Sequence, residues 1–207
     1  MSLSPFMLNA SLIPQLHDQA TAHWHDADRP LLAASNPLET LILDQHRANF
    51  DLWHCEDQAR APLITNRTMV EIKHSIDTLN QLRNDLAERI DVMLLEAAPA
   101  QPASAPLHSE TPGLMVDRLS ILALKIFHTA EETHRPGASS DHHQRNRERL
   151  VLLTEQRADL ASCLTALWTE VLAGQRRFKL YRQLKMYNDP ALNPVLYGNA
   201  TKDKGPA

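Results

Sequence analysis

The chain has 207 residues, of which 43% are hydrophobic and 22% are charged, and only 5 are glycine. Its formal net charge of −4 offers no overall positive field to nucleic acid, and no stretch is long and apolar enough to cross a bilayer. We therefore predict one globular domain over residues 1–197, without a nucleic-acid partner and without membrane insertion.

The start of the chain and its cysteines bear on the compartment. The N-terminal sequence MSLSPFMLNASLIP lacks the basic start and continuous apolar stretch of a secretory signal. The two cysteines, Cys55 and Cys163, lie in helical patterns without a metal-binding spacing. These features predict a cytoplasmic protein with two free thiols.

Helix-forming residues are abundant and no alternating β-branched run is present, so the predicted fold class is all-α. We expect a short helix near residues 8–23, followed by long helices over 37–60, 68–96, 112–134 and 141–172. Their apolar residues recur every three or four positions, as in helices that bury one stripe. Thr111 before Pro112 predicts a helix start, and Gly174 predicts a helix end. The pattern favours an up-and-down bundle of four long helices with a short N-terminal helix.

Three segments lie outside the predicted long helices. Residues 98–113 are rich in Ala and Pro and predict a flexible linker within the domain, and residues 198–207 predict a disordered tail. The basic sequence QRRFKLYRQLKMYNDP predicts a further helical segment that ends at an Asn-Asp-Pro turn. This segment is interpreted as a solvated helix face, as a nucleic-acid contact, or as a lid that supplies Lys179, Tyr181 or Lys185 to a pocket.

Polar residues occupy helix positions that the periodic pattern reserves for hydrophobic ones. They are His46, Trp53, Asp57 and Arg60 in the 37–60 helix, Asn80, Arg83 and Asn84 in the 68–96 helix, and Asp117, Lys125 and His128 in the 112–134 helix. Those of the 37–60 helix lie within about 40° of His46 around the helix axis. Burying such groups without partners costs several kcal/mol per ion. We therefore expect either a closed structural network or a polar pocket.

The pocket hypothesis predicts the chemistry of its ligand. Arg83 and Lys125 suit an anionic group, and Trp53 suits stacking against a sugar or a base. The mixture predicts a small polar or phosphorylated ligand such as a sugar phosphate or a nucleotide sugar, and it leaves the cofactor open. The candidate catalytic residues, paired as His with Asp for proton transfer, are His46, Asp57, Asp117 and His128. In the network hypothesis, Arg83 instead bridges Asp57 or Asp117 and no ligand binds.

A metal site is a further alternative, because Glu-x-x-His occurs twice, at Glu71–His74 and at Glu131–His134. Bundles that hold two irons use two such motifs and two further glutamates. However, Glu71 and His74 point away from the buried stripe of their helix. Glu71 also stands three residues after Thr68, which is the spacing of a capping box. We assign no metal ligand and keep the di-metal carboxylate bundle as an alternative.

Four stretches resemble the signature blocks of an uncharacterised bacterial family, domain of unknown function family 4254. They are HRANFDLWHCEDQAR, IDTLNQLRND, ETPGLMVDRLSILALKIFH and KLYRQLKMYNDP. The resemblance implies that the shared motifs contain His46, Asn49, Trp53, His54, Glu56, Asp57, Asn80, Arg83, Asn84, Asp117, Arg118, Lys125, His128, Lys185, Tyr187, Asn188 and Asp189. It implies no activity and no cofactor. Members of that family are often encoded near glycosyltransferases of envelope polysaccharide synthesis, which implies a glycan-related setting.

Two function classes follow. The first is a ligand-binding or catalytic bundle, and the second is a non-catalytic helical partner that docks on a glycosyltransferase or on a second copy of the chain. An open pocket favours the first, whereas complete internal pairing with an exposed apolar patch favours the second. The candidate ligand-binding residues are Trp53, Asn80, Arg83, Asn84, Arg118, Lys125, Lys179, Tyr181, Lys185, Tyr187 and Asn188.

Overall fold

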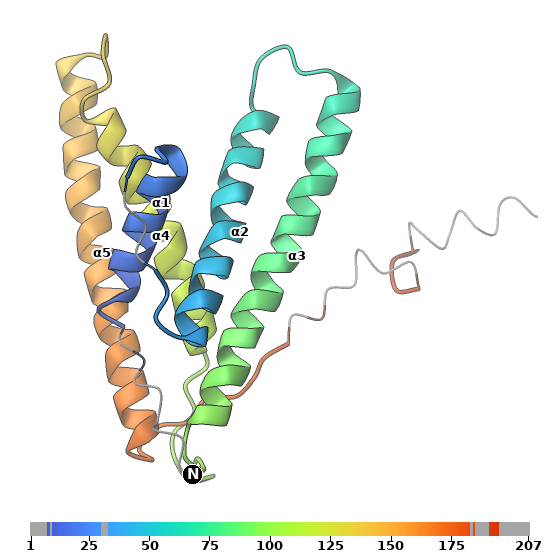
Figure 1. Cartoon of the computed structure of the whole chain (residues 1–207), viewed down its shortest axis with the longest axis vertical. Helices are drawn as coiled ribbons and strands as arrows, with labels where there is room; N and C mark the ends of the chain where they lie inside the picture. The colour runs from blue at the N-terminus through green and yellow to red at the C-terminus, as the bar shows by residue number, and fades with distance from the viewer. Residues whose placement is uncertain (1–7, 9, 30–32, 183, 185–190, 195–207) are drawn as a thin grey trace, which may run out of the picture.

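The structure, a computed structural model, describes residues 8, 10–29, 33–182, 184 and 191–194. Its helices are α1 (Ile13–His25), α2 (Pro37–Ala59), α3 (Asn66–Ala97), α4 (Pro112–Glu132) and α5 (Ser140–Leu172). This part of the chain holds no strand, only one isolated parallel bridge between Leu107 and Arg177. The all-α class and the up-and-down order are confirmed (Figure 1). None of the helices in the described part is long and apolar enough to cross a membrane.

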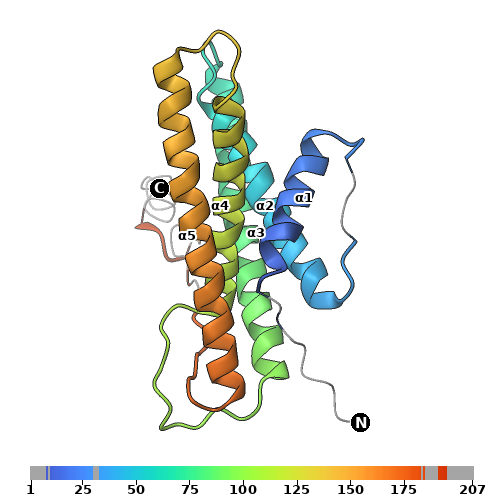
Figure 2. The same ribbon diagram turned by 90° about the vertical axis from the view of Figure 1, so that its left-hand side faces the viewer.

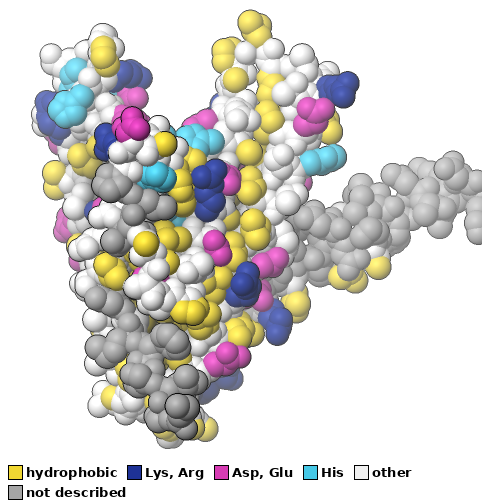
Figure 3. All heavy atoms as spheres, viewed as in Figure 1, with side chains coloured by type: hydrophobic (Ala, Val, Ile, Leu, Met, Phe, Trp, Pro, Cys, Tyr) yellow, Lys and Arg dark blue, Asp and Glu magenta, His cyan; other side chains and the backbone are white. Residues whose placement is uncertain are grey.

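Two antiparallel hairpins, α2 with α3 and α4 with α5, form the body of the molecule. They meet at the lower end of Figure 1 and diverge towards the 60–65 and 133–139 turns, so the described bundle is V-shaped. Helix α1 packs against α4 and α2, and Figure 2 places it beside α2. The space-filling view has a notch between the two arms, with histidine side chains close to it (Figure 3). The hairpin turns therefore lie at one end of the bundle, as the predicted up-and-down order requires.

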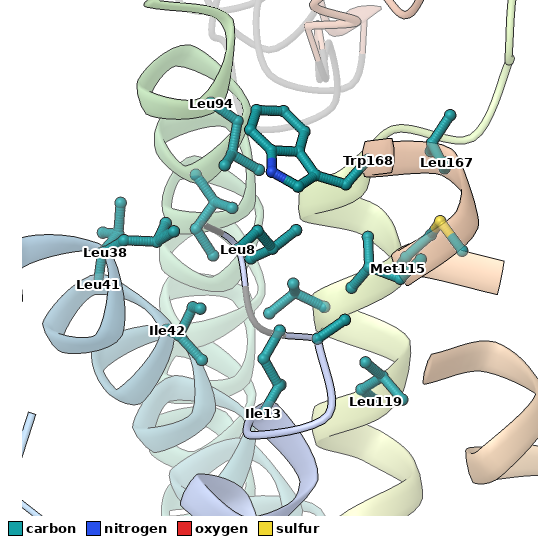
Figure 4. Close-up of a cluster of buried hydrophobic side chains, with 14 of the residues drawn as sticks. Leu8, Ile13, Leu38, Leu41, Ile42, Leu94, Met115, Leu119, Leu167 and Trp168 are labelled. Carbon is teal, nitrogen blue, oxygen red and sulfur yellow. The ribbon is translucent and has the colours of Figure 1, made fainter. Parts of the chain in front are cut away.

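The hydrophobic core lies at the end where the hairpins converge. Figure 4 shows side chains from α1, α2, α3, α4 and α5 meeting there, together with Leu8. The labelled core residues are Leu8, Ile13, Leu38, Leu41, Ile42, Leu94, Met115, Leu119, Leu167 and Trp168. A smaller cluster of Leu52, Ile72 and Ile76 joins α2 to α3 nearer the tips. The core thus holds the two hairpins together at the end where they converge. The polar faces of the helices lie nearer the hairpin turns.

Side-chain caps mark the starts of α2, α3, α4 and α5, and one of them corrects a prediction. The hydroxyl of Thr65 accepts a hydrogen bond from the backbone N–H of Thr68 at 3.2 Å, so α3 begins at Asn66. The capping box predicted at Thr68 is therefore wrong, because Thr68 already lies inside the helix. Glu71 instead pairs with Arg67 one turn earlier, at 3.2 Å.

The predicted linker over residues 98–113 makes specific backbone contacts. The N–H of His108 donates to the carbonyl of Arg177 at 2.8 Å, and the N–H of Arg177 donates to the carbonyl of Pro106 at 3.1 Å. Phe178 follows this bridge and is buried in the core. Backbone hydrogen bonds thus tie part of the segment to the chain that follows α5, and the flexibility of the linker stays a prediction.

The chain after α5 corrects the prediction of a C-terminal helical segment. Gly174 adopts a φ of 69°, which ends α5, and the N–H of Gln175 returns to the carbonyl of Glu170 at 2.8 Å. Residues 175–182 are then not helical, and the backbone of Arg177 pairs with Pro106 and His108 instead. The Asn-Asp-Pro turn and three candidate residues, Lys185, Tyr187 and Asn188, lie outside the described residues.

The contact between α3 and α4 depends on Gly113. A Cβ atom there would lie 2.2 Å from the carbonyl oxygen of Ala87, which belongs to the backbone of α3. We therefore expect Gly113→Ala to lower the free energy of unfolding by about 3 kcal/mol, measured by urea denaturation. Gly137→Ala is the control, because it has a φ of +79° and open space around it and should cost about 1 kcal/mol. Equal losses in both variants would contradict the close approach of the two helices.

Candidate functional site

Asp117 of α4 is the centre of a buried polar network. One carboxylate oxygen, Oδ1, accepts hydrogen bonds from the side-chain amides of Gln45 at 2.6 Å and Asn49 at 2.9 Å. The other, Oδ2, accepts from Nη2 of Arg83 at 2.8 Å. Asp117 is only 7% exposed, so these three donors offset the cost of burying its charge. The prediction that Arg83 bridges a carboxylate is confirmed, and the carboxylate is Asp117.

His46 of α2 lies in a second part of this network, without a carboxylate partner. Its Nδ1 lies 2.7 Å from the hydroxyl of Ser120, and its Nε2 lies 2.8 Å from the hydroxyl of Thr21 and 3.0 Å from the carbonyl of His17. A carbonyl can only accept, so Nε2 carries the proton and Nδ1 accepts from Ser120. Burial lowers the pKa of His46 to about 3, so the ring is neutral.

An open pocket, here named the Arg83 pocket, adjoins the Asp117 network. It has a volume of about 480 Å³ and is lined by Asn49, Leu52, Trp53, Glu56, Asp57, Arg60, Asn80, Arg83, Ile121 and Leu124. Its charges are largely balanced, because Arg60 lies 3.0 Å from Glu56 and 4.0 Å from Asp57. The Nε of Arg83 is buried without a hydrogen-bond partner. This pocket therefore combines carboxylates, amides and an indole, without a clear surplus of charge.

A second open pocket, here named the Lys125 pocket, lies between α2, α4 and α5. Its volume is about 500 Å³, and it is lined by Trp53, Lys125, His128, Thr129, Glu132, Asn146, Arg149, Leu152, Leu153 and Gln156. The only carboxylate among these residues, Glu132, is bound by His142 at 2.7 Å and by Arg135 at 3.1 Å. Its negative charge is thus already compensated from outside the pocket.

The two cations of the Lys125 pocket have no such compensation. Lys125 is exposed and has no ion pair within the described chain. Arg149 donates to the amide oxygen of Asn146 at 3.1 Å and likewise has no carboxylate partner among the described residues. The Lys125 pocket therefore carries a surplus of positive charge in a chain whose net charge is negative.

Trp53 separates these two pockets, because its side chain lines both of them. Its indole stacks on the imidazole of His128, with ring centroids 5.1 Å apart and an angle of 10° between the planes. A flat aromatic surface in this position can support the ring of a sugar or a base.

A third open pocket lies lower on α4 and α5. It has a volume of about 720 Å³ and shares Lys125 and Gln156 with the Lys125 pocket and Ile121 with the Arg83 pocket. Arg118, a predicted ligand-binding residue, lines it but pairs with Glu110 at 2.7 Å. The three pockets share lining residues and follow one another along α4.

Comparison with known families agrees with the sequence blocks. Residues 39–180, more than half of the chain, match the family described as Protein of unknown function (DUF4254). The chain belongs to the DUF4254 family. No curated protein and no solved structure matches it. The matched region of this DUF4254 protein includes every residue that lines the three pockets, but it begins after α1.

The candidate catalytic residues of the DUF4254 chain separate into two groups. His46 and Asp117 belong to the buried network, and they line none of the three pockets. Asp57 lines the Arg83 pocket and His128 lines the Lys125 pocket. His128 bonds to Glu131 on its own helix, at 2.9 Å. The structure therefore does not bring these four residues together as histidine–aspartate pairs.

The candidate ligand-binding residues are also divided. Trp53, Asn80, Arg83, Arg118 and Lys125 line the pockets of the DUF4254 chain, whereas Asn84 is half-buried on α3 and lines none of them. Lys179 and Tyr181 follow the bridge between Leu107 and Arg177, and they line none of the three pockets.

Sequence reasoning missed several residues of this site. Gln45, Ser120 and Thr21 hold the network together, and Arg149 contributes a cation to the Lys125 pocket. Arg149 lies in SSDHHQRNRER, whose composition is that of a solvated helix start. Only the packing of α5 beside α4 shows which face of this part of α5 is the inner one.

Proposed function

We propose that this DUF4254 protein binds an anionic, polyhydroxylated small molecule, a sugar phosphate or a nucleotide sugar, on the inner face of α4. The observation that carries the proposal is the pair of cations, Lys125 and Arg149, that line one open pocket without a carboxylate partner among the described residues. Two such cations repel each other, and a phosphate group relieves that repulsion and accepts hydrogen bonds from both.

The neighbouring Arg83 pocket suits the uncharged part of such a ligand. Its carboxylates, Glu56 and Asp57, accept hydrogen bonds from sugar hydroxyls, and the amide of Asn49 offers a polar edge. Trp53 lies at the junction, where the sugar or base would rest against it. Each pocket lies within the range of about 300–1,000 Å³ that is usual for small-molecule sites.

The direct test measures binding of four probes to the purified chain by calorimetry: glucose, inorganic phosphate, glucose 1-phosphate and UDP-glucose. We expect glucose 1-phosphate and UDP-glucose to bind more tightly than either glucose or inorganic phosphate alone. A ligand at 100 times its Kd should also raise the free energy of unfolding by about 2.7 kcal/mol.

Three variants locate the site. Lys125→Ala and Arg149→Ala change exposed side chains, so the fold should be kept, and each should weaken sugar-phosphate binding about tenfold, or about 1.4 kcal/mol. Arg147→Ala is the matched control, because Arg147 is exposed on the same helix and lines none of the three pockets. Equal affinity of all three variants, or glucose binding as tightly as its phosphate, would refute the proposal.

A helical partner is the second candidate, and exposed apolar residues on α5 favour it. Val151 is 70% exposed and Leu152 is 53% exposed, and Leu152 also lines the Lys125 pocket. A glycosyltransferase, which the family resemblance implies, or a second copy of the chain would cover these residues. If none of the four probes binds, and the chain self-associates in a way that Leu152→Ser abolishes, the second candidate is supported instead.

A further inference from the structure

Three histidines from three different helices converge beside the Lys125 pocket. They are His25 at the end of α1, His54 in α2 and His128 in α4, and one ring nitrogen of each lies within 4.8 Å of those of the other two. The ring centroids of His25 lie 5.1 Å from those of His54 and of His128. The residues are far apart in the sequence, so the fold alone brings them together.

The hydrogen bonds of His25 and His128 engage Nδ1 and leave a lone pair on Nε2. Nδ1 of His25 lies 2.8 Å from the carbonyl of Thr21, so it carries the proton and leaves a lone pair on Nε2. Nδ1 of His128 lies 2.9 Å from the carboxylate of Glu131. The Nε2 atoms of His128 and His54 are both buried without a hydrogen-bond partner among the described residues. Buried nitrogens of this kind cost free energy unless something binds them.

The same hydrogen bonds are typical of metal ligands. A histidine that binds a metal usually donates its second ring N–H to a carbonyl or a carboxylate, which orients the ring and raises its basicity. The carbonyl of Thr21 and the carboxylate of Glu131 are placed to do this for His25 and His128. Two of the three histidines thus already have the outer hydrogen bond that a metal site requires.

Aromatic neighbours hold the rings in place. His25 stacks on Phe127 with centroids 4.4 Å apart, His54 meets the edge of Phe50 at 4.5 Å, and His128 stacks on Trp53 at 5.1 Å. Such packing limits the rotamers of the ligands before any ion arrives.

The electrostatic surroundings are compatible with a bound cation. Burial lowers the pKa of His54, and the nearby His25 and His128 lower it further. The carboxylates of Asp57 and Asp51 act on His54 in the opposite direction. They would balance part of the charge of an ion at this position.

We propose that His25, His54 and His128 bind one divalent transition-metal ion, Zn²⁺ in the first instance, with a fourth coordination position open. Imidazole nitrogens suit zinc, copper and nickel rather than magnesium or calcium. No carboxylate or thiol joins the three histidines in the described chain, and three protein ligands with one open position are usual for zinc sites that act on a substrate. Zinc–nitrogen bonds of about 2.0–2.1 Å place the nitrogens about 3.3 Å apart, so the rings need only small rotations to close on the ion.

This site differs from the di-metal carboxylate alternative. His74 and His134, the histidines of the two Glu-x-x-His motifs, are exposed and lie outside the cluster. Glu131 takes part only through its hydrogen bond to His128. The site also does not depend on the proposed sugar phosphate, because the metal alone can be tested.

The experiment uses the full chain, freed of metal with a chelator and then titrated with Zn²⁺ by calorimetry and with Co²⁺ by visible spectroscopy. We expect one ion per chain and a cobalt absorption band typical of four-coordinate geometry. His54→Ala and His128→Ala should each weaken Zn²⁺ binding at least 100-fold. Glu131→Gln, which changes an exposed side chain, should weaken it about 10-fold because only the outer hydrogen bond is altered.

Two control variants complete the design. His74→Ala tests an exposed histidine on α3, and His142→Ala tests the neighbouring histidine that bonds to Glu132, and both should bind Zn²⁺ like the parent. Circular dichroism of each metal-free variant checks its fold, and His54→Gln replaces His54→Ala if that variant is unfolded. The proposal is overturned if the chain does not bind one Zn²⁺ ion, or if the folded variants at His54 and His128 both bind Zn²⁺ with the affinity of the parent. The three histidines would then contribute only aromatic packing.

Discussion

Acidification from pH 6.5 towards pH 3 is expected to unfold the protein, because His17 and His46 are buried as neutral rings. Burial lowers the pKa of both, to about 3 for His46. The pKa of His17 is lowered further by the neighbouring His46 and Arg157. In the unfolded chain both histidines titrate near the usual value of about 6.5. Below that pH the unfolded state binds protons that the folded state cannot bind, so this part of the stability is present above pH 6.5 and is lost as the pH falls.

The expected size of the effect is large. Each of the two histidines contributes a slope of about 1.4 kcal/mol per pH unit, and His46 alone accounts for about 5 kcal/mol between pH 6.5 and pH 3. A domain of this kind has a total stability of only about 5–15 kcal/mol. The pair is therefore sufficient to unfold the chain in moderate acid.

Asp91 acts in the opposite direction over part of this range. Its buried carboxylate accepts a hydrogen bond from the N–H of Gly113 at 2.6 Å, and burial raises its pKa to about 6. The folded state therefore takes up this proton first, and stability rises as the pH falls from about 6 to about 4. Between about pH 6 and pH 4, Asp91 should therefore offset the slope of stability with pH that one histidine contributes. Below about pH 4 it should offset none of it.

Urea denaturation at pH 7.5, 6.5, 5.5 and 4.5 measures these slopes. His17→Leu removes one titrating ring and replaces it with an apolar side chain of similar size, so it should reduce the acid sensitivity. Asp91→Asn should make the slope between pH 6 and pH 4 steeper, since it removes the opposing group. His74→Ala, an exposed control, should leave the slope unchanged. If the free energy of unfolding of His17→Leu changes with pH as steeply as that of the parent, buried His17 does not contribute to the acid sensitivity.

The helices and their order could be predicted from the sequence because periodicity and caps are local signals. Asn36, Thr111 and Ser139 each cap the helix that follows, and the apolar stripes define which faces are buried. The residues after α5 could not be predicted in the same way. Their conformation depends on backbone hydrogen bonds between Arg177 and the 106–108 segment, about 70 residues earlier, which leave no periodic pattern.

The sequence predicts which polar residues turn towards the interior, but it does not predict how they pair. Helix phase correctly placed Arg83 and Asp117 towards the interior, because rotation about a helix axis follows from the sequence. It could not show that His46 bonds to Ser120 rather than to a carboxylate, since that depends on how far α2 is shifted along α4. His25 escaped attention for a related reason, because it is the last residue of α1 and belongs to no stripe.

Replacing Asp117 is expected to be among the most destabilising changes in the polar interior. Asp117→Ala leaves the Arg83 charge without its partner and the amide N–H groups of Gln45 and Asn49 without their acceptor. Such a loss should lower the free energy of unfolding by about 3–5 kcal/mol, measured by urea denaturation at pH 7.5. Asp57→Ala is the matched control from the same predicted polar stripe, because its side chain is 60% exposed and should cost at most about 0.5 kcal/mol.

A double-mutant cycle separates the ion pair from the rest of the network. Arg83→Leu alone leaves Asp117 with two amide donors, so it should cost less than Asp117→Leu alone. The double variant, Arg83→Leu with Asp117→Leu, removes both charges at once, and it should be more stable than the sum of the two single losses predicts, by about 1–3 kcal/mol. Strict additivity would mean that the 2.8 Å contact contributes nothing to stability. Arg83 would then be held by the pocket alone, and its charge would be available to a ligand.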